Sequence, residues 1–417
     1  MRSDTGGLHR PTVWLGLSCV IAAVAYLPIL NNGFIADDYV ILKRIETLKT
    51  QPLYLFQVPP ENFRLVSYII FGALKTLVGY HASVFYAFNI ALHLANIILL
   101  SRLLRVLIKD ETTIALAVIL FGAFQAPQEA VMWLAAMNET TLFFFTLLTL
   151  ICWSEERYVI ATVTYTFALF SKESGIIVPA LILLFDVYRN RFVWNRYVLL
   201  LIPTAVFFAI FLSTLSNNFM LTNRSYSFGP HALVVLGVSL HRLLWPWFYI
   251  ILSVVWIRAA KIPWTFLAAS IGTVVLMMLP YMFISYQNSL PSRQLYLASA
   301  VLMTTFASLL KPLRGTALQK MVVAAFVAFN VGYLWFRKDA QFEERAAPTT
   351  QLIDALMQHT PQRTTIGNFA YPYPEIVAGA ALAVPGWNSG LVFVDDPDRP
   401  CSDCLRLEWN ARDRRYF

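Results

Sequence analysis

Residues 11–39 read PTVWLGLSCVIAAVAYLPILNNGFIADDY, a long apolar run that ends in a short polar turn and two adjacent aspartates. The run from Pro11 to Leu30 has the length of about 20 residues that an α-helix needs to cross the hydrocarbon core of a bilayer. A histidine and two arginines precede it, and it lacks the small-residue cleavage site of a removed signal peptide. We therefore expect a retained first span with its N-terminal end in the cytoplasm.

The composition of the whole chain agrees with this interpretation. Hydrophobic residues make up 58% of the 417 residues and charged residues only 13%, whereas soluble domains contain about 25% charged residues. Aromatic residues account for 15% and there are four cysteines, which excludes a disordered chain or a disulfide scaffold. An integral membrane protein is the class that remains.

Further apolar runs follow along the chain. They lie near residues 82–106, 113–127, 138–153, 158–170, 174–188, 197–215, 231–257, 264–285, 294–310 and 320–336. With the first run they predict an all-α polytopic bundle of about eleven transmembrane helices. We expect residues 1–337 to form this membrane module and residues 338–417 to form a small extracytoplasmic domain.

The basic residues support one orientation. The first 337 residues hold 24 basic and 13 acidic residues, and the remainder holds 8 and 11. If successive spans alternate in direction from a cytoplasmic N-terminus, the following basic residues lie in loops on the cytoplasmic side: Arg102, Arg105 and Lys109; Arg157; Arg189, Arg191 and Arg196; Arg258 and Lys261; Lys311, Arg314 and Lys320. This distribution matches the positive-inside rule. The sequence has no basic stripe interleaved with aromatic residues, so we do not expect nucleic acid as a partner.

An odd number of spans places the C-terminal segment on the outer face. There Cys401 and Cys404 could form a disulfide or remain two thiols. The long first outer loop, residues 31–81, contains the short apolar stretch Phe63 to Val78, which we expect to be a helix lying on the membrane surface rather than a span.

The acidic pair Asp37 and Asp38 is the first candidate site. Neighbouring carboxylates repel each other, so one tends to keep its proton or to find a cation, and either state suits a general base. The alternative is a solvated turn in which one aspartate caps a helix.

The sequence Ser171-Lys172-Glu173 is the second candidate. Ionisable groups at a membrane boundary are costly unless they are solvated or paired, which makes them functional candidates. Equally, Glu173 could stabilise a helix N-terminus while Lys172 extends to the interface.

Short patterns in a particular order resemble the GT-C membrane glycosyltransferases. The resemblance is to the branch that contains the protein O-mannosyltransferases and the transmembrane and tetratricopeptide-repeat family. In that branch an acidic pair follows the first span, and this chain has FIADDY at that place. An arginine then introduces an outer helix, and here Arg64 does so in ENFRLVSYIIFGAL. A later span resembles FYAFNIALHLAN, which contains Asn89 and His93.

The second half of the pattern follows in the same order. Gln128-Glu129-Ala130-Val131 resembles a T-E-A-V loop, and Glu139 opens the next span. FALFSKESGIIVPALILLFD and SRQLYLAS resemble the remaining two elements of the branch. The chain departs from the pattern at Leu65, where proline is usual, and at Asn138-Glu139, where an Arg-x-Asp sequence is usual, and it shows no tetratricopeptide repeats.

The resemblance implies an enzyme that moves a sugar from a polyprenyl-phosphate donor to an acceptor hydroxyl on the extracytoplasmic face by inverting displacement. Asp37 or Asp38 would be the base. Cations stabilise the departing phosphate, and the candidates are Arg64, Lys172 and Arg293. The candidates for binding the sugar or the acceptor are Glu129, Glu139, Glu173 and Tyr296.

The expected partners are the lipid-linked donor, a protein, lipid or glycan acceptor, and membrane lipids. We expect no cofactor and no metal, since the six histidines show no close ligand spacing. The expected location is a bacterial inner membrane with the site facing the periplasm. A transporter or flippase of a lipid-linked sugar and an inert assembly subunit remain the alternatives.

Overall fold

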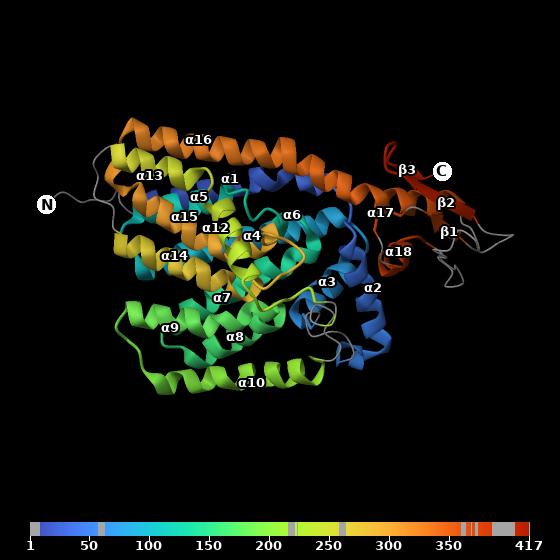
Figure 1. Cartoon of the computed structure of the whole chain (residues 1–417), viewed down its shortest axis with the longest axis horizontal. Helices are drawn as coiled ribbons and strands as arrows, with labels where there is room; N and C mark the ends of the chain where they lie inside the picture. Colours follow the sequence, from blue (N-terminus) through green and yellow to red (C-terminus); the bar gives the residue numbers. More distant parts are fainter. Residues whose placement is uncertain are drawn as a thin grey trace.

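The computed structural model describes residues 9–56, 63–215, 222, 224–257, 264–359, 364–367, 369–371, 374–385 and 405–416. Apolar helices form a bundle, and most of them run roughly along the longest axis of the molecule (Figure 1). These are α1 (His9–Tyr26), α4 (Ala82–Leu107), α5 (Glu111–Ala123), α7 (Met137–Ser154), α8 (Tyr158–Ser171), α9 (Val178–Tyr188), α10 (Val198–Ser213), α12 (His231–Leu244), α13 (Trp247–Ile257), α14 (Trp264–Met278), α15 (Tyr296–Leu309) and α16 (Ala317–Tyr333). The expected polytopic helical fold is confirmed, since the described residues are mostly helical.

The core of the bundle forms around α5, which packs against α1, α4 and α15. α5 is apolar on all sides, as expected of a helix surrounded by others. Asp110 caps its N-terminus by accepting a hydrogen bond from the backbone N–H of Thr112 at 3.4 Å. Glycine at position 122 allows close packing, because an added Cβ would lie 3.1 Å from side-chain atoms of Ala22 and Ile97.

The number of spans differs from the expected one. Among the described residues, six helices are long and apolar enough to cross a membrane, or seven if the bent pair α12 and α13 counts as one span. The expected count of about eleven is therefore not confirmed. Several of the expected spans form shorter helices, including α5, α8 and α9, which have 13, 14 and 11 residues.

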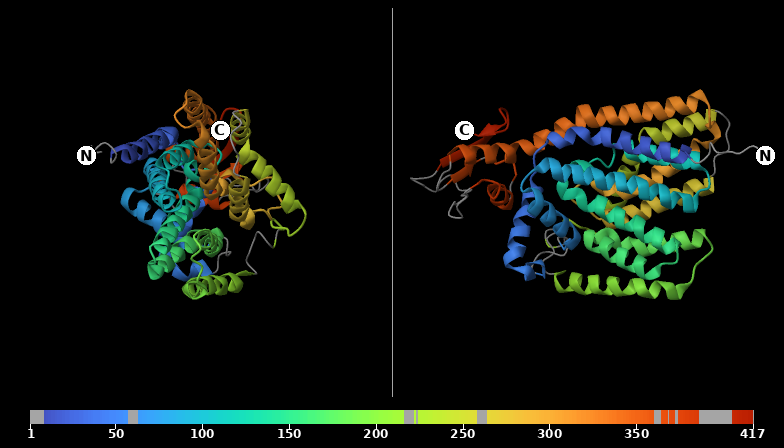
Figure 2. Two further views of the ribbon diagram at one scale, coloured as in Figure 1. Left: turned by 90° about the vertical axis from the view of Figure 1, so that its left-hand side faces the viewer. Right: turned by 180° about the vertical axis from the view of Figure 1, so that it is seen from behind.

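Two helices of the first loop lie at one end of the bundle. These are α2 (Asp37–Thr50) and α3 (Leu65–Val78), and between them lies the short η2 (Pro52–Phe56). α2 runs across the long axis in both side views, at the end opposite the N-terminus (Figures 1 and 2). The helix that we expected over 63–78 forms as α3, whose 14 residues span about 21 Å and are too short for a bilayer core of about 30 Å.

The chain after α16 leaves the bundle at the same end as α2 (Figure 1). A π-helical turn, Leu334–Lys338, joins α16 to α17 (Asp339–His359). The expected boundary after residue 337 falls inside this turn, and the division into two domains stays a prediction. A small sheet follows, in which β1 (Thr364–Gly367) pairs in parallel with β2 (Leu405–Asn410), and β2 pairs antiparallel with β3 (Arg415–Tyr416).

The C-terminal part also packs on the first loop. α18 (Pro374–Ala381) lies against α2, where Gly379 is so close that an added Cβ would be 2.2 Å from the carbonyl oxygen of Tyr39. The pair Cys401 and Cys404 lies outside the described residues. Packing on α2 brings the C-terminal part next to the acidic pair.

Candidate active site at the α2 end of the bundle

The acidic pair opens α2 directly after a strained turn. Ala36 has a φ of 38° and a ψ of −100°, and such a positive φ costs a non-glycine residue about 1–3 kcal/mol. The two carboxyl groups that follow have different surroundings, because Asp37 is exposed whereas Asp38 is fully buried.

Asp38 connects two loops through its carboxylate. One oxygen accepts a hydrogen bond from the backbone N–H of Ile35 at 2.7 Å, and the other accepts one from the backbone N–H of Ala135 at 2.6 Å. Burial raises the pKa of Asp38 to about 8, while these two hydrogen bonds act in the opposite direction and Asp37 adds to the rise. With both oxygens engaged and no exposed surface, Asp38 positions the start of α2 against the loop η4 (Leu134–Ala136).

Asp37 faces positively charged groups and is reached by water. The surrounding protein raises the pKa of the Asp37 carboxyl by partial desolvation, and Arg293, Arg345 and Arg64 oppose this rise through their charges. A carboxylate with a raised pKa and an exposed position is suited to accept a proton. Of the two expected bases, Asp37 therefore has the geometry of a catalytic group and Asp38 that of a positioning residue.

Three side chains form what we call the accessible ion cluster: Glu129, Arg293 and Arg345. Glu129 lies in α6 (Glu129–Met132), and its two oxygens lie 3.3 Å from Arg293 and 3.4 Å from Arg345. Both guanidinium groups stack on the ring of Trp133, with distances to its centroid of 4.8 Å and 4.5 Å. Each of the three charged side chains remains 19–28% exposed.

The charges in this cluster do not balance within it. Burial alone would raise the pKa of Glu129, but Arg293 and Arg345 hold it below its ordinary value. One carboxylate thus faces two guanidinium groups, whose combined positive charge also reaches Asp37. Such an arrangement can receive an anionic group while Asp37 stays beside it.

A second ion pair joins α3 to the loop after α8. Arg64 donates two hydrogen bonds to the carboxylate of Glu173, from Nε at 3.3 Å and from a terminal nitrogen at 3.1 Å. Burial would raise the pKa of Glu173, and Arg64 and Lys172 lower it below its ordinary value. The side chain of Arg64 is 26% exposed and that of Glu173 is 33% exposed, so solvent reaches both.

Lys172 and Glu139 form what we call the buried ion pair. The Lys172 ammonium donates to Glu139, and the two side chains are only 3% and 1% exposed. The hydroxyl of Tyr281 donates to Glu139 at 3.3 Å and to Ser174, and the ammonium lies 4.8 Å from the centre of the Tyr281 ring. Both side chains are almost fully enclosed, and the expected roles of Lys172 in phosphate binding and of Glu139 in sugar binding stay predictions.

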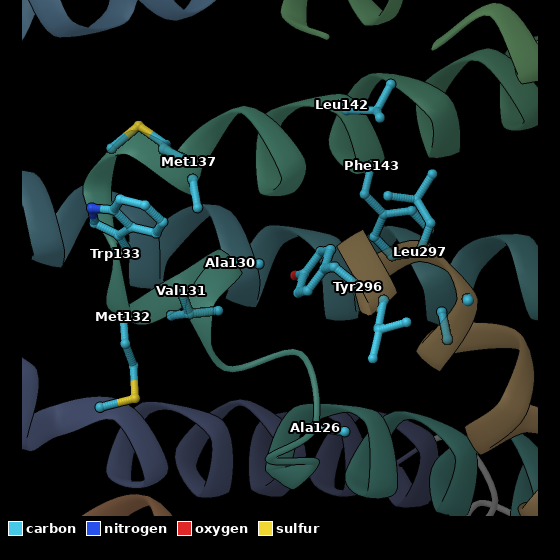
Figure 3. Close-up of a cluster of buried hydrophobic side chains, with 14 of the residues drawn as sticks. Ala126, Ala130, Val131, Met132, Trp133, Met137, Leu142, Phe143, Tyr296 and Leu297 are labelled. Carbon is cyan, nitrogen blue, oxygen red and sulfur yellow. The ribbon is translucent and has the colours of Figure 1, made fainter. Parts of the chain in front are cut away.

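Tyr296 is also placed differently from the expectation. It is fully buried, and Figure 3 shows it in the hydrophobic cluster with Phe143 and Leu297. Its hydroxyl lies 2.6 Å from Nδ1 of His93 and accepts a hydrogen bond from Asn96 at 3.2 Å. Through these bonds Tyr296 holds α4 and α15 together, and its expected role in binding sugar or acceptor stays a prediction.

Asn89 of α4 supports the accessible ion cluster by bonding to the backbone of α6. Its side-chain amide donates to the carbonyl oxygens of Ala130 and Val131, both at 2.9 Å, and its oxygen accepts from Thr140 at 2.6 Å. These bonds fix the short helix α6 that carries Glu129. The motif FYAFNIALHLAN therefore contributes structural support to the site.

Arg345 and Trp133 are site residues that the sequence analysis missed. Arg345 lies in a charged stretch of α17, and Trp133 has no charged neighbour in sequence. A possible signal for Arg345 is its spacing of three residues from Phe342, which is buried, because this places the arginine on the inner face of its helix. Among the described residues, no group of three or more histidine, cysteine, aspartate or glutamate side chains is placed to hold a metal ion.

Comparison with known proteins gives limited information. No family model matches the chain, and no curated protein matches it significantly. Among solved structures, it is similar to the oligosaccharyltransferase of Archaeoglobus fulgidus, which was crystallised tethered to an acceptor peptide, with a TM-score of 0.45 and 14% identity. The match covers 84% of this chain and 57% of the neighbour. The chain is an integral membrane protein by its apolar helices, and the similarity by itself assigns no activity.

Proposed function

We propose that the chain is a membrane glycosyltransferase that uses a polyprenyl-phosphate sugar as donor, with its active site on the extracytoplasmic face. One observation carries the proposal: Asp37 is exposed at the start of α2 within the fields of Arg64, Arg293 and Arg345. A base beside a group of cations, at one end of an apolar bundle, suits a reaction between a lipid-linked phosphate and a water-soluble hydroxyl.

The proposed reaction is a single inverting displacement. Asp37 accepts the proton of the acceptor hydroxyl while that oxygen forms a bond to the anomeric carbon of the donor sugar. The bond between this carbon and the phosphate oxygen breaks, and the phosphate leaves with the bonding electrons. Negative charge grows on the leaving phosphate, so Arg293 and Arg345 stabilise the transition state more than the ground state.

The remaining accessible residues receive supporting roles. Arg64 and Glu173 border the site, where Arg64 offers a second group for the phosphate and Glu173 offers an acceptor for sugar hydroxyls. Arg293 or Arg345 can release Glu129 and bind the arriving phosphate instead, since a solvent-accessible ion pair contributes only about 0–1 kcal/mol. The acceptor belongs to the class of protein, lipid or glycan hydroxyls, and the proposed location is a bacterial inner membrane.

The bent pair α12 and α13 favours a second candidate, a transporter of a lipid-linked sugar. The two helices meet at an angle of 61°, and broken spans of this kind occur in transporters near the substrate. A transporter would move the lipid between leaflets without breaking its glycosidic bond. It would not need Asp37 as a base.

The test uses the full chain in lipid nanodiscs with a panel of radiolabelled polyprenyl-phosphate sugars. We expect label from one donor to be released or transferred by the native chain and not by Asp37→Asn. Glu46→Gln is the control, because Glu46 is an acidic residue of the same helix that pairs with Lys49 and Lys75 outside the site. Binding of a donor without release of label would contradict the enzyme, and lipid movement between leaflets would establish the transporter.

A further inference from the structure

A recess at the opposite end of the bundle contains an unusual group of donors. It lies where α8 begins and α9 ends, at the end of the molecule that carries the N-terminus (Figure 1). Its walls include Tyr158, Arg189, Arg191 and Arg196. The accessible ion cluster and Asp37 lie at the other end, so the recess is separate from the proposed active site.

Three of these donors, on Tyr158, Arg189 and Arg196, have no hydrogen-bond or ion-pair partner among the described residues. The hydroxyl of Tyr158 is buried and has no hydrogen-bond partner among the described residues. The guanidinium group of Arg196 stacks over the Tyr158 ring at 5.1 Å and that of Arg189 over Phe185 at 5.6 Å, and neither forms an ion pair within the described part of the chain. A buried donor without a partner costs about 1–3 kcal/mol, which favours a ligand that accepts hydrogen bonds.

The charge balance of the recess selects an anion. Two carboxylates face the three arginines: Glu156, which pairs with Arg191 at 3.7 Å, and Asp186. Asp186 already accepts hydrogen bonds from the indole of Trp153 at 3.0 Å and from the hydroxyl of Tyr197 at 2.8 Å. Arg189 and Arg196 are left to attract a negatively charged group.

The size of the recess indicates how such a group would enter. Its enclosed volume of about 10 Å³ holds one atom of the size of a water oxygen. A phosphate could insert one oxygen toward the Tyr158 hydroxyl and keep its remaining oxygens at the mouth, within reach of the arginines. The substituents of the phosphate would stay outside the recess.

An apolar groove begins next to the recess. It has a volume of about 320 Å³ and lies between α8 and α10, where its walls include Val159, Val163, Leu199 and Ile202. Val159 directly follows Tyr158, so the groove starts where the recess ends. Two threonines of the groove, at positions 162 and 166, donate their hydroxyls to carbonyl oxygens of their own helix at 2.9 Å, which leaves the groove surface apolar.

The length of the groove fits one lipid chain. From Val159 to Phe170 the helix rises about 16 Å, which is half of a hydrocarbon core of about 30 Å. Phe170 closes the far end, with its ring 6.1 Å from that of Phe207 and 5.8 Å from that of Phe63. Beyond that end, Arg64 is already held by two hydrogen bonds to Glu173, so the unsatisfied donors for a phosphate lie at the inner end.

Exposed aromatic side chains mark the level of the membrane interface around the recess. Tyr188, Phe192 and Trp194 are all exposed, between 54% and 72%, and lie in the same turn as the arginines. Aromatic residues concentrate at the level of lipid head groups, and basic pockets between helices on the cytoplasmic side bind anionic head groups. A lipid is therefore favoured over a free phosphate ion.

We propose that an anionic phospholipid occupies this composite site, with its phosphate at Tyr158, Arg189 and Arg196 and one acyl chain in the groove between α8 and α10. The site is independent of the proposed glycosyl transfer. It would fix the positions of α8 and α10 from the cytoplasmic leaflet.

Native mass spectrometry of the full chain in non-ionic detergent tests the proposal, with phosphatidylglycerol and phosphatidylcholine as probes. We expect phosphatidylglycerol to bind at least tenfold more tightly than phosphatidylcholine. Arg196→Gln should weaken its binding about tenfold, because a charge-assisted hydrogen bond is lost. Tyr158→Phe, which removes only the hydroxyl, should weaken it severalfold, and Val163→Trp should weaken it by filling the groove without a change in charge.

Arg102→Gln is the matched control, because Arg102 is an exposed arginine at the same end that pairs with Glu155 at 2.5 Å. Its substitution should leave lipid binding unchanged. Equal losses in Arg102→Gln and Arg196→Gln would overturn the proposal in favour of general charge attraction. Unchanged binding by Val163→Trp, or displacement of phosphatidylglycerol by an equal concentration of polyprenyl phosphate, would overturn the assignment of the groove. Each variant is first compared with the native chain in thermal unfolding without lipid, so that a folding defect is recognised.

Discussion

The α2 end of the bundle holds two groups of opposite charges that differ in their access to solvent. The accessible ion cluster has side chains that are 19–28% exposed, whereas the buried ion pair has side chains that are at most 3% exposed. Their glutamates, Glu129 and Glu139, are ten residues apart in sequence and lie in successive helices. Residues of the same type thus serve different purposes according to the packing around them.

The same contrast separates the two neighbouring aspartates. Asp37 is exposed to water and interacts electrostatically with three arginines. Both carboxyl oxygens of Asp38 accept hydrogen bonds from backbone N–H groups. Water screens an accessible ion pair, so a substrate can replace one partner at low cost. A buried pair cannot exchange partners in this way, because an unpaired buried charge is strongly unfavourable.

Replacing the two aspartates one at a time gives the largest expected contrast. Asp37→Asn should lower kcat by about 10²–10⁴, the usual contribution of a general base, and should leave the thermal unfolding temperature unchanged. Asp38→Asn should instead lower the free energy of unfolding by about 1–3 kcal/mol, because its amide N–H₂ would face one of two buried backbone donors. The measurements are transfer of a labelled sugar and thermal unfolding. A stable Asp38→Asn variant with lost turnover, beside an active Asp37→Asn variant, would reverse the assignment.

Breaking the buried ion pair tests the other side of the comparison. Lys172→Met should lower the free energy of unfolding by about 3–5 kcal/mol, since it leaves Glu139 charged and unpaired in the interior. The exposed pair of Lys49 and Glu46 gives the control, because Lys49→Met should cost less than about 1 kcal/mol. The double variant Lys172→Met with Glu139→Leu should recover part of the loss. Full stability of Lys172→Met with lost donor binding would return Lys172 to the phosphate site.

Removing one arginine of the accessible ion cluster should have a smaller effect. Arg345→Gln should lower kcat about tenfold, which corresponds to about 1.4 kcal/mol, because Arg293 remains to stabilise the leaving phosphate. Arg414→Gln is the control. Arg414 lies on the exposed surface and pairs at 3.2 Å with Glu344, which is the neighbour of Arg345 in α17. An Arg345→Gln variant as active as the Arg414→Gln variant would exclude Arg345 from the site.

The sequence predicted the fold class, and the roles of the site residues stay predictions. The apolar runs identified the membrane bundle, and the order of motifs brought Asp37, Arg64 and Glu129 together at one end before any contact was known. The division of roles between Asp37 and Asp38 could not be predicted, because it depends on the backbone at Ala36 and on a hydrogen bond from Ala135, 97 residues away. Packing between distant helices, which no local pattern records, decided which ions became buried.

The position of Arg345 also depends on a contact between distant segments that local sequence does not record. It reaches Glu129 across 216 residues of sequence, because α17 continues from α16 at the end of the bundle that carries α2. A charged helical stretch is usually solvated on all sides, and only the structure shows that Arg345 of α17 reaches Glu129. The expected number of spans is not confirmed for a related reason, because hydrophobic length does not distinguish a spanning helix from a short buried one.

The smallest expected effect concerns the pH dependence of the reaction. Asp37 must be ionised to accept a proton, so kcat/KM should fall as the pH drops through its pKa, which lies above the ordinary value for aspartate. Arg345 lowers this pKa by its charge, and Arg345→Gln should therefore move the acidic limb of the profile to higher pH. Water screens the interaction, so we expect a shift of less than about one pH unit that shrinks further in high salt.

Arg105→Gln provides the control for this shift, because Arg105 pairs with Glu111 near the other end of the bundle. Its profile should coincide with that of the native chain. A shift toward lower pH in Arg345→Gln would mean that the titrating group is not a carboxylate stabilised by this arginine. Suppose that Arg345→Gln shifts the acidic limb in the expected direction and that Asp37→Asn abolishes turnover. These two results together would connect the accessible ion cluster to the base, because a purely structural arginine would change stability without moving the limb.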